Sequence, residues 1–314
     1  PPRSTLFPYT TLFRSQASDL RGYFELDFND TDQMFRRQIA LYAEQFPNII
    51  VETTHHEVAR SQHEIDIRYD EAGNIAESIT TMKMIIKMVA AKMGFVATFM
   101  PKPWAGHNGS GMHVHESLWK NGRNAFYDAN DPNKISDLMR HFIGGQLKHA
   151  KEMTALLNSW PNSYKRLVPG YEAPTYISWG FKNRSMLIRV PNFFEKESAA
   201  RMEIRSPDPA GNIYLQIAAL LTTGLEGIKH KIDPPAPTEL NVFGLTEEEK
   251  SKMGIEKLPE SLGQALYAFR NSKLMKEMMG EAAYKNFYDN KMAENQLYNS
   301  TVSEWELKRY SEQL

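Results

Sequence analysis

Apolar residues recur at helical spacing in several long stretches of the chain. Residues 74–93 place an apolar side chain at every third or fourth position, and Gly94 follows as a stop signal. The same spacing predicts helices over 31–46, 135–157 and 212–230, and a mostly polar helical region over 238–314. Gly144 and Gly145 would weaken the helix over 135–157 unless another backbone packs closely against them.

Other stretches alternate between polar and apolar positions. Residues 64–69 place Glu64, Asp66 and Arg68 on one face and apolar or aromatic side chains on the other. This pattern predicts a half-buried antiparallel strand with a charged face. Further strands are predicted at 49–52, 95–100, 113–117, 185–191 and 201–206. Residues 162–174 are rich in Tyr, Pro and Gly without any period, which predicts a functional loop.

The first residues stand apart from the rest. Residues 5–15 resemble the conceptual translation of a common short-read sequencing adapter, so we expect residues 1–15 not to be native. On this interpretation the native domain spans residues 16–314. The alternative is a genuine N-terminal strand, because these residues favour β structure.

Composition limits the possible functions. The chain has 314 residues, 41% hydrophobic and 24% charged, which is typical of a globular protein of one large domain or two. A net charge of -1 gives no reason to expect a nucleic acid or a membrane as partner. Because there is no cysteine, a metal would need His, Asp and Glu ligands, which favours Mg²⁺ or Mn²⁺. No secretory signal or spanning stretch is visible, which fits a cytoplasmic protein.

Residues 108–117, with the sequence Asn-Gly-Ser-Gly-Met-His-Val-His-Glu-Ser, form the most suggestive motif. The glycines let backbone N–H groups approach a ligand closely. Strand alternation then places His113, His115 and Ser117 on one face. Taken alone, the motif also fits an ordinary polar strand face, so its interpretation as a metal and phosphate site depends on the rest of the chain.

Carboxylates and arginines elsewhere in the chain support the interpretation as a metal and phosphate site. Residues 201–205 place Glu203 between two arginines on one face, and we expect four such polar faces to converge on a funnel. The candidate metal ligands are Glu57, Glu64, His113 and Glu203, and the candidate anion binders are Arg166, Arg184, Arg189, Arg201 and Arg205. Such a cavity suits phosphoryl transfer, although neither a Walker A motif nor a kinase glycine loop is present. For any single strand, a solvated polar face is the better explanation of the pattern.

Several motifs together resemble the type I glutamine synthetase family of bacteria and archaea, over residues 22–314. They are His-His-Glu-Val-Ala (55–59), Gln-His-Glu-Ile (62–65), Met-Pro-Lys-Pro (100–103), Asn-Gly-Ser-Gly-Met-His (108–113), Asn-Ser-Tyr-Lys-Arg-Leu-Val-Pro-Gly-Tyr-Glu-Ala-Pro (162–174), Asn-Arg-Ser (183–185) and Arg-Met-Glu-Ile-Arg-Ser-Pro-Asp-Pro (201–209). The resemblance implies an α+β fold, in which helices back a curved antiparallel sheet and the C-terminal region is helical. It also implies ATP-dependent ligation of ammonia to L-glutamate through γ-glutamyl phosphate, with two Mg²⁺ or Mn²⁺ ions per site, in a cytoplasmic homo-oligomer, a dodecamer.

The resemblance assigns roles residue by residue. Glu57 and Glu64 match ligands of one metal, and His113 and Glu203 match ligands of the other. Positions that bind ATP are matched by Glu52, His115, Ser117, Arg184, Arg189 and Arg201. Positions that bind glutamate are matched by Asn108, Gly109, Arg166 and Arg205, and Arg184 also lies near the transferred phosphoryl group. Glu172 matches a flap carboxylate that closes the site and takes a proton from ammonium; its alternative is an exposed loop acid.

Some features depart from the family pattern. The family has an N-terminal β-grasp domain and a following acidic strand that adds one carboxylate to each metal, and we expect this chain to lack both. The chain alone is therefore expected to be inactive or impaired. Arg60 and Ser61 depart from the usual turn, and Phe243 stands where some bacterial members carry an adenylylated tyrosine. Two alternatives remain: a γ-glutamyl-amine ligase acting on a polyamine-type amine, and a non-catalytic relative kept for assembly or regulation.

Overall fold

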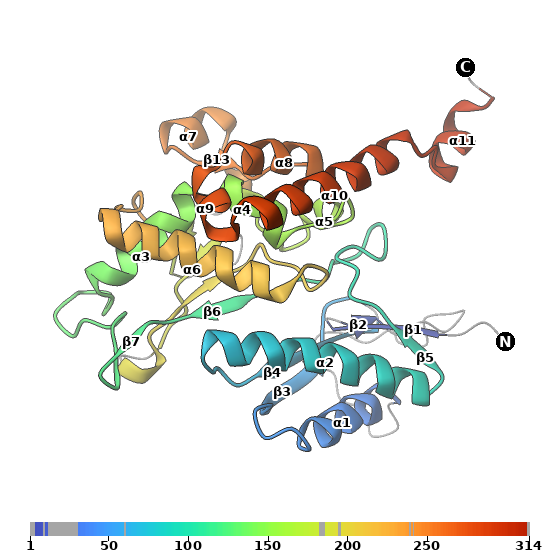
Figure 1. Cartoon of the computed structure of the whole chain (residues 1–314), viewed down its shortest axis with the longest axis horizontal. Helices are drawn as coiled ribbons and strands as arrows, with labels where there is room; N and C mark the ends of the chain where they lie inside the picture. Colours follow the sequence, from blue (N-terminus) through green and yellow to red (C-terminus); the bar gives the residue numbers. More distant parts are fainter. Residues whose placement is uncertain are drawn as a thin grey trace.

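The computed structural model describes residues 4–8, 10–11, 31–59, 61–181, 186–193, 196–238, 240 and 242–312. Strands are concentrated in the first two thirds of the chain, and the C-terminal third is almost entirely helical (Figure 1). The helices α1 and α2 lie at one end of the molecule in this view, and the C-terminal helices lie at the other, with strands between them. This arrangement confirms the predicted α+β class and the helical C-terminal region.

The helices follow the predicted apolar periods in most places. Their bounds are α1 (Thr31–Ala43), α2 (Ala72–Lys92), α3 (Asp137–Lys148), α4 (Ala150–Leu157), α5 (Ser163–Arg166), α6 (Ile213–His230), α7 (Glu247–Lys252), α8 (Leu262–Arg270), α9 (Lys273–Met279), α10 (Glu281–Ser300) and α11 (Glu304–Tyr310). The helix α6 begins where expected, because the side chain of Asn212 accepts a hydrogen bond from the Leu215 N–H at 3.2 Å.

The prediction of one helix over 135–157 was wrong, since the chain breaks at His149 between α3 and α4. The backbone of His149 (φ -98°, ψ 11°) ends α3, and the two helices pack against different partners. Helix α3 packs on α6, whereas α4 packs mainly on α8. An apolar period continues through such a break because both helices bury their apolar faces in one core.

The strands form two main sheets. The first has the order β2-β4-β1-β5, with β3 paired to β4, and contains β1 (Ser4–Pro8), β2 (Thr10–Thr11), β3 (Val51–His56), β4 (Gln62–Ile67) and β5 (Phe95–Ala97). The pairing of β3 with β4 is antiparallel, as predicted, while β1 runs parallel to β4 and β5. Segments within residues 1–15 thus form strands in the first sheet; that these residues are not native stays a prediction.

The second sheet has the order β10-β11-β12-β6 and carries much of the candidate chemistry. Its strands are β6 (Val114–Glu116), β10 (Trp179–Gly180), β11 (Ile188–Arg189) and β12 (Met202–Ile204). Shorter pairs join β7 (Trp119–Lys120) to β8 (Arg123–Asn124) and β9 (Tyr176–Ile177) to β13 (Glu256–Lys257). The strands observed at 95–97, 114–116 and 202–204 are shorter than predicted, and the predicted loop 162–174 includes the short helix α5.

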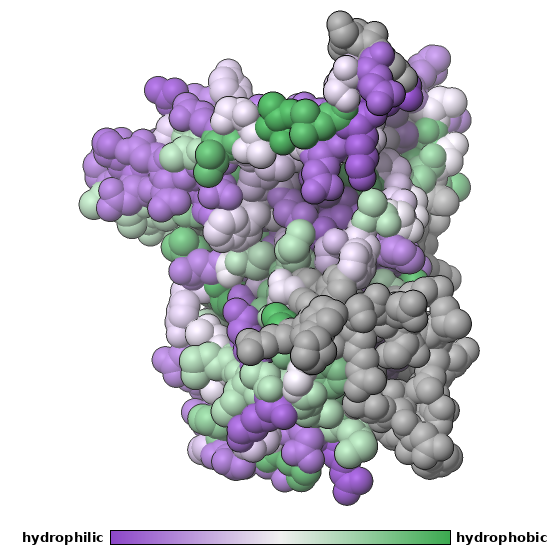
Figure 2. All heavy atoms as spheres, turned by 90° about the vertical axis from the view of Figure 1, so that its right-hand side faces the viewer, coloured by the Kyte–Doolittle hydropathy of each residue, from purple (hydrophilic) through white to green (hydrophobic). Residues whose placement is uncertain are grey.

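Two large apolar cores among the described residues hold these layers. The smaller lies between α1, α2 and the first sheet and includes Phe35, Ile39 and Ile86. The larger joins the second sheet to the helices and includes Phe142, Trp179 and Phe269. The face that carries the C-terminal helices is largely hydrophilic, with apolar side chains in separate patches (Figure 2). This surface agrees with the mostly polar composition of 238–314.

Glycines let α3 and α6 approach closely. A Cβ atom on Gly145 would lie 2.2 Å from the Thr223 carbonyl oxygen and 2.6 Å from the Gly227 backbone, and one on Gly144 would lie 2.0 Å from the Ile232 carbonyl oxygen. These distances are far shorter than real contacts, so α3 and α6 can pack this closely only with glycine at the crossing. The sequence predicted that another backbone must pack closely against Gly144 and Gly145 if they lie in a helix, and the structure shows this contact.

Replacing Gly145 with Ala should therefore force the two helices apart and lower the free energy of unfolding by about 1–3 kcal/mol. Gly73, in the first turn of α2, is the matched control, because nothing lies within 4 Å of its added Cβ. Gly73→Ala should instead leave stability unchanged or raise it by up to about 1 kcal/mol. Denaturant unfolding followed by circular dichroism measures both, and equal effects would contradict the close crossing.

Candidate active site

The hairpin of β3 and β4 gathers acidic side chains and a histidine on one face. His55 pairs with Glu64 in the register, and Thr53 pairs with Asp66. Because directly opposite residues of an antiparallel pair share a face, the three titratable side chains meet. The His55 Nε2 atom lies 3.0 Å from Glu64 Oε2, and ligand atoms of His55, Glu64 and Asp66 lie within 4.8 Å of one another. We call these three residues, together with Glu57, the hairpin cluster.

The carboxyl group of Glu57 interacts with this group. Burial first, and then its hydrogen bond with Glu64, raise the pKa of Glu57 to about 7. Burial alone would also raise the pKa of Glu64, but hydrogen bonds with His55 and Glu57 lower it overall. The pKa of His55 is raised to about 8 despite burial, through its hydrogen bond to Glu64. The cluster thus holds excess negative charge that a proton partly neutralises.

This set of donors fits a hard divalent cation. Carboxylate oxygens with one imidazole suit Mg²⁺ or Mn²⁺, and a cation would take the place of this proton. The sequence predicted Glu57 and Glu64 as ligands and missed His55 and Asp66 as their neighbours. Alternation along 64–69 already placed Asp66 on the face of Glu64. The position of His55 required the register of β3 against β4.

A second cluster surrounds Glu203 on β12. This carboxylate is only 2% exposed and lies between two arginines, with Arg189 Nη2 at 2.6 Å and Arg205 Nη1 at 2.6 Å. His113 Nδ1 lies 3.3 Å from Glu203 Oε1. We call Glu203 and its three partners the β12 cluster. A charged group is tolerated at this depth because two oppositely charged groups lie close to it.

The pairing of strands explains why these side chains meet. Glu203 is opposite both Arg189 on β11 and His115 on β6. Arg201 and Arg205 flank Glu203 at alternate positions, so they share its face. Arg201 Nε donates to His115 Nδ1 at 3.1 Å, and the His115 side chain is exposed. The structure therefore brings together the anion binders and the carboxylate that the sequence predicted for these strands.

His113 is held as a neutral imidazole. Burial lowers its pKa well below 6.5, and the positive charges of Arg205 and Arg166 lower it further. A neutral imidazole has one unprotonated nitrogen, and this is the form that binds metals. The electrostatic environment of His113 thus agrees with the ligand role that the resemblance implies.

The glycine turn connects the two clusters. Gln62 on β4 donates from Nε2 to the Gly109 carbonyl at 3.0 Å. A Cβ on Gly109 would lie 2.9 Å from Arg166 Cγ, and one on Gly111 would lie 2.5 Å from Arg166 Nη2 and 3.2 Å from His113 Nε2. The turn therefore packs against the buried Arg166 in a way that only glycine allows. Asn108 is half-buried at the start of this turn.

Arg166 has a clear structural task. Its guanidinium donates to the backbone carbonyls of Ser206 at 2.7 Å and Arg205 at 2.9 Å. These bonds tie α5 to the end of β12, directly beside Arg205. The predicted role of Arg166 in holding a glutamate carboxylate stays a prediction, while its role in positioning the 205–207 segment is visible.

Other predicted residues lie at the margin of these clusters. Ser117 accepts a hydrogen bond from the Trp119 indole at 3.0 Å. Glu52 is exposed, at the bulge between Val51 and Thr53 in β3. Arg184 lies outside the described residues. The predicted ATP contacts of these residues therefore stay predictions.

The loop 162–174 is anchored at two points. The Asn162 side chain accepts from the Lys102 N–H at 2.8 Å and donates to the Lys102 carbonyl at 3.0 Å. The Lys102 ammonium lies 3.5 Å from the centre of the Tyr171 ring. Between these anchors and Ala173, Glu172 is exposed and adopts a left-handed backbone (φ 57°), which is unusual for a residue other than glycine. Such backbone strain is often found at functional sites.

Removing one acid of the hairpin cluster should weaken metal binding. Glu64→Gln should lower the Mn²⁺ affinity of the chain by more than about tenfold, because the amide loses the charge that the cation needs. Asp66→Asn should have an effect in the same direction. Glu44→Gln, an exposed acid on the turn after α1, should have none. Electron paramagnetic resonance of free Mn²⁺ measures all three, and unchanged affinity in Glu64→Gln would exclude the hairpin as a metal site.

Comparison with known proteins now identifies the family. Residues 2–310 match the glutamine synthetase catalytic domain. Glutamine synthetase of Pyrococcus furiosus is 49% identical over 321 aligned positions, which cover 98% of this chain and 72% of that protein.

Solved structures agree with the sequence match. Glutamine synthetase of Plasmodium falciparum superposes with a TM-score of 0.82 at 30% identity, covering 93% of this chain and 64% of that one. A complex of GmaS with ADP has a TM-score of 0.82 at 32% identity, covering 95% of this chain and 68% of that one. The chain spans 64 to 72% of the length of these relatives. The family predicted from the sequence is confirmed: this chain belongs to the glutamine synthetase family and consists mostly of its catalytic domain.

Proposed function

We propose that the protein ligates ammonia to the γ-carboxylate of L-glutamate at the expense of ATP, and so makes glutamine. The observation that carries this proposal is the β12 cluster, in a chain whose relatives at 45 to 49% identity over most of its length are glutamine synthetases. A buried carboxylate, a neutral imidazole and converging arginines at one place are the groups that this ligation needs.

The first step brings two anions together. The glutamate γ-carboxylate attacks the terminal phosphorus of ATP, which breaks the bond to the departing ADP and leaves γ-glutamyl phosphate. Positive groups must offset the repulsion between the reactants. Arg189, Arg201 and Arg205 are proposed to do so. Their closeness to Glu203 and His115 supports this role, and Arg166 donates to the backbone carbonyl of Arg205. Arg184 is proposed to act at the transferred phosphoryl group.

Two divalent ions, Mg²⁺ or Mn²⁺, are proposed to occupy the two clusters. Glu57 and Glu64, with His55 and Asp66 beside them, would hold one, and His113 and Glu203 would hold the other. When bound, such ions neutralise phosphate charge and orient the nucleotide. That GmaS was solved with ADP supports a nucleotide site in this fold. Glu52, His115 and Ser117 are the proposed ATP neighbours.

The second step needs ammonia and the exclusion of water. Ammonia displaces phosphate from γ-glutamyl phosphate, and a base must accept the proton that ammonium loses. Glu172 is proposed as this base and as the part of the 162–174 loop that closes over the intermediate. Asn108 and Gly109, next to Arg166, are proposed to hold the glutamate. The anchors at Asn162 and Tyr171 limit where Glu172 can move.

Assembly and location extend the same proposal. We propose that the complete protein forms a dodecamer of two hexameric rings in the cytoplasm, with each active site shared between neighbours. Among the helices that the structure describes, none is long and apolar enough to cross a membrane. Because Phe243 has no hydroxyl, adenylylation at this position is excluded chemically.

Glu203 provides a direct test. Glu203→Ala in the complete protein should abolish Mn²⁺-dependent glutamine formation, because the change removes a ligand and leaves two guanidinium groups without their partner. Glu203→Gln keeps the shape of the side chain and removes its charge, so a loss of activity in this variant is not caused by a cavity. Glu197→Gln, which removes the acid of an exposed pair with Arg123, should retain activity. Light scattering checks assembly, and full turnover in either Glu203 variant would remove this residue from the site.

The choice of amine separates glutamine synthesis from its closest rival. The complete protein should form γ-glutamyl hydroxamate from glutamate and hydroxylamine, and glutamine from ammonia, at rates well above those with putrescine or ethylamine. Because Glu172 is present to deprotonate ammonium, ammonia should be preferred. A protein that makes no hydroxamate but couples glutamate to another amine is a γ-glutamyl-amine ligase. A protein that binds Mn²⁺ and ATP without any turnover is a non-catalytic relative.

A further inference from the structure

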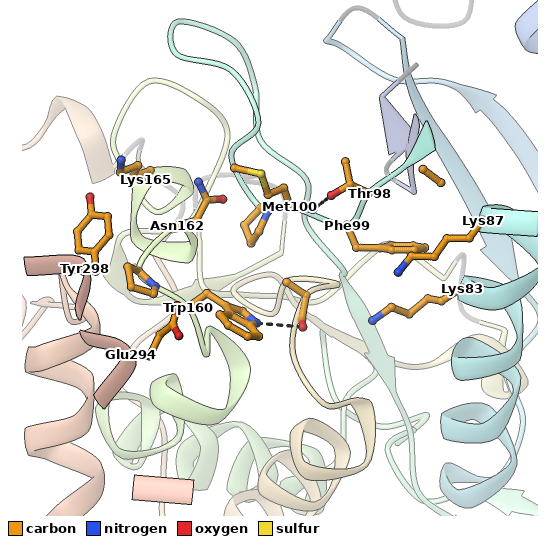
Figure 3. Close-up of a pocket in the computed structure, with 14 residues that line it drawn as sticks. Lys83, Lys87, Thr98, Phe99, Met100, Trp160, Asn162, Lys165, Glu294 and Tyr298 are labelled. Atoms are coloured by element: carbon orange, nitrogen blue, oxygen red, sulfur yellow. Dashed lines mark hydrogen bonds between the residues drawn. The ribbon is translucent and has the colours of Figure 1, made fainter. Parts of the chain in front are cut away.

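A cavity of about 430 Å³ opens between α2, the end of β5, the segment before α5, and α10 (Figure 3). None of the residues assigned above to metals or nucleotide lines it, and of the 162–174 loop only Asn162 and Lys165 do. Its volume is within the range of pockets that hold small ligands. The cavity is therefore a separate site whose chemistry can be considered independently of the reaction.

Three lysines line this cavity. Lys83 and Lys87 project from α2, one turn apart, and Lys165 lies across the cavity beside Tyr298 (Figure 3). Lys83 donates to the Pro209 carbonyl at 2.6 Å. In the described part of the chain, none of the three forms an ion pair with a carboxylate. Glu294 is the acidic residue among those that line the cavity in the described part of the chain. It projects from α10, on the side away from Lys83 and Lys87 (Figure 3).

In the part of the chain that the structure describes, no carboxylate forms an ion pair with the lysines at the α2 wall. Burial lowers the pKa of the Lys83 ammonium and the like charge of Lys87 lowers it further, and the negative charge of Asp208 offsets these two effects only in part. The ammonium of Lys83 is held by its hydrogen bond to the Pro209 carbonyl. An anion placed between Lys83 and Lys87 would add an ion pair, which is stronger in a partly desolvated cavity.

An exposed aromatic ring forms another part of the binding surface. Phe99 is only 7% exposed, and the Lys83 and Lys87 ammonium groups lie 5.0 Å and 5.6 Å from its ring centre, so this ring supports the two lysines. The Trp160 indole is fixed by its hydrogen bond to the Ala210 carbonyl at 3.1 Å, and it is 37% exposed (Figure 3). The Lys291 ammonium lies over this ring, 3.4 Å from its centre, so only the rest of the indole is available. A fixed aromatic ring in a cavity with cations favours a ligand that combines a flat ring with a negative group.

We propose that this cavity binds a small organic anion carrying a planar ring, with its carboxylate or phosphate between Lys83 and Lys87 and its ring against Trp160. The walls of the cavity continue into both active-site loops. The Pro101 carbonyl accepts from the Ser110 N–H at 2.7 Å, and Asn162 anchors the 162–174 loop. The proposal concerns binding alone and does not depend on the proposed ligation.

The test uses phenyl phosphate as probe on the full chain, with calorimetry at low salt. Phenyl phosphate should bind at least about tenfold more tightly than inorganic phosphate, which lacks the ring, and phenol, which lacks the charge. Lys83→Met combined with Lys87→Met should weaken phenyl phosphate binding by about tenfold to a hundredfold, as expected for lost charge-assisted hydrogen bonds. Lys92→Met, an exposed lysine on the same helix that bonds Tyr42, should leave binding unchanged.

Two further variants make the result decisive. Lys87→Met alone disturbs no hydrogen bond of the described chain and should still weaken binding if the double variant fails to fold. Arg205→Met removes an arginine of the proposed active site and should leave phenyl phosphate binding unchanged. Binding that is lost in Arg205→Met but kept in the lysine variants would place the probe in the active site and overturn the proposal. Equal affinity for phenyl phosphate and inorganic phosphate would overturn it too.

Discussion

The burial of the Glu203 carboxylate between Arg189 and Arg205 is the constraint on which the second sheet depends. A charge with 2% exposure is stable only with close partners of opposite sign. Strand register supplies those partners, because Arg189 and His115 lie directly opposite Glu203 and Arg205 follows it by two positions. A slip of one residue would turn all of these side chains into the apolar core behind the sheet. The same pairing that stabilises the strands therefore arranges the charged groups of the proposed active site.

Close backbone contacts hold the rest of the structure around this sheet. Gly109 and Gly111 allow the turn before β6 to pack closely against Arg166. The guanidinium of Arg166 donates hydrogen bonds to the backbone carbonyls that follow β12. Gly145 and Gly227 allow α3 and α6 to cross closely over the larger core. In both places the missing side chain permits the contact, and a single methyl group would push the partners apart. Stability and site geometry thus depend on the same small residues.

The hairpin cluster and the β12 cluster differ in charge, and this difference suits their proposed tasks. Glu57, Glu64 and Asp66 concentrate negative charge that a proton moderates. Around Glu203 the arginines leave an excess of positive charge, and burial together with this charge keeps His113 neutral. The proposed reaction joins two anions, glutamate and ATP, and uses divalent metal ions. It therefore needs a positive environment for the anions and a negative one for the metal ions. The hydrogen bond from Gln62 to the Gly109 carbonyl links the elements that carry them. The lysine-lined cavity beside α2 adds a third charged environment, lined in part by Pro101 and Asn162.

The sequence alone determined the family, most helices and the chemical type of the site. The regular apolar spacing of 74–93 and 212–230 predicted α2 and α6, and alternation in 64–69 and 201–206 predicted which charged side chains share a face. These features are local, since they depend only on the geometry of a helix or strand.

The tertiary structure decided the features that depend on contacts between distant parts of the chain. The break at His149 arises because α3 and α4 pack on different helices, and the meeting of His55 with Glu64 follows from strand register. The neutral state of His113 and the lowered pKa of Lys83 come from burial and from charged neighbours in space. Such effects depend on distances through space, and those exist only once the chain has folded.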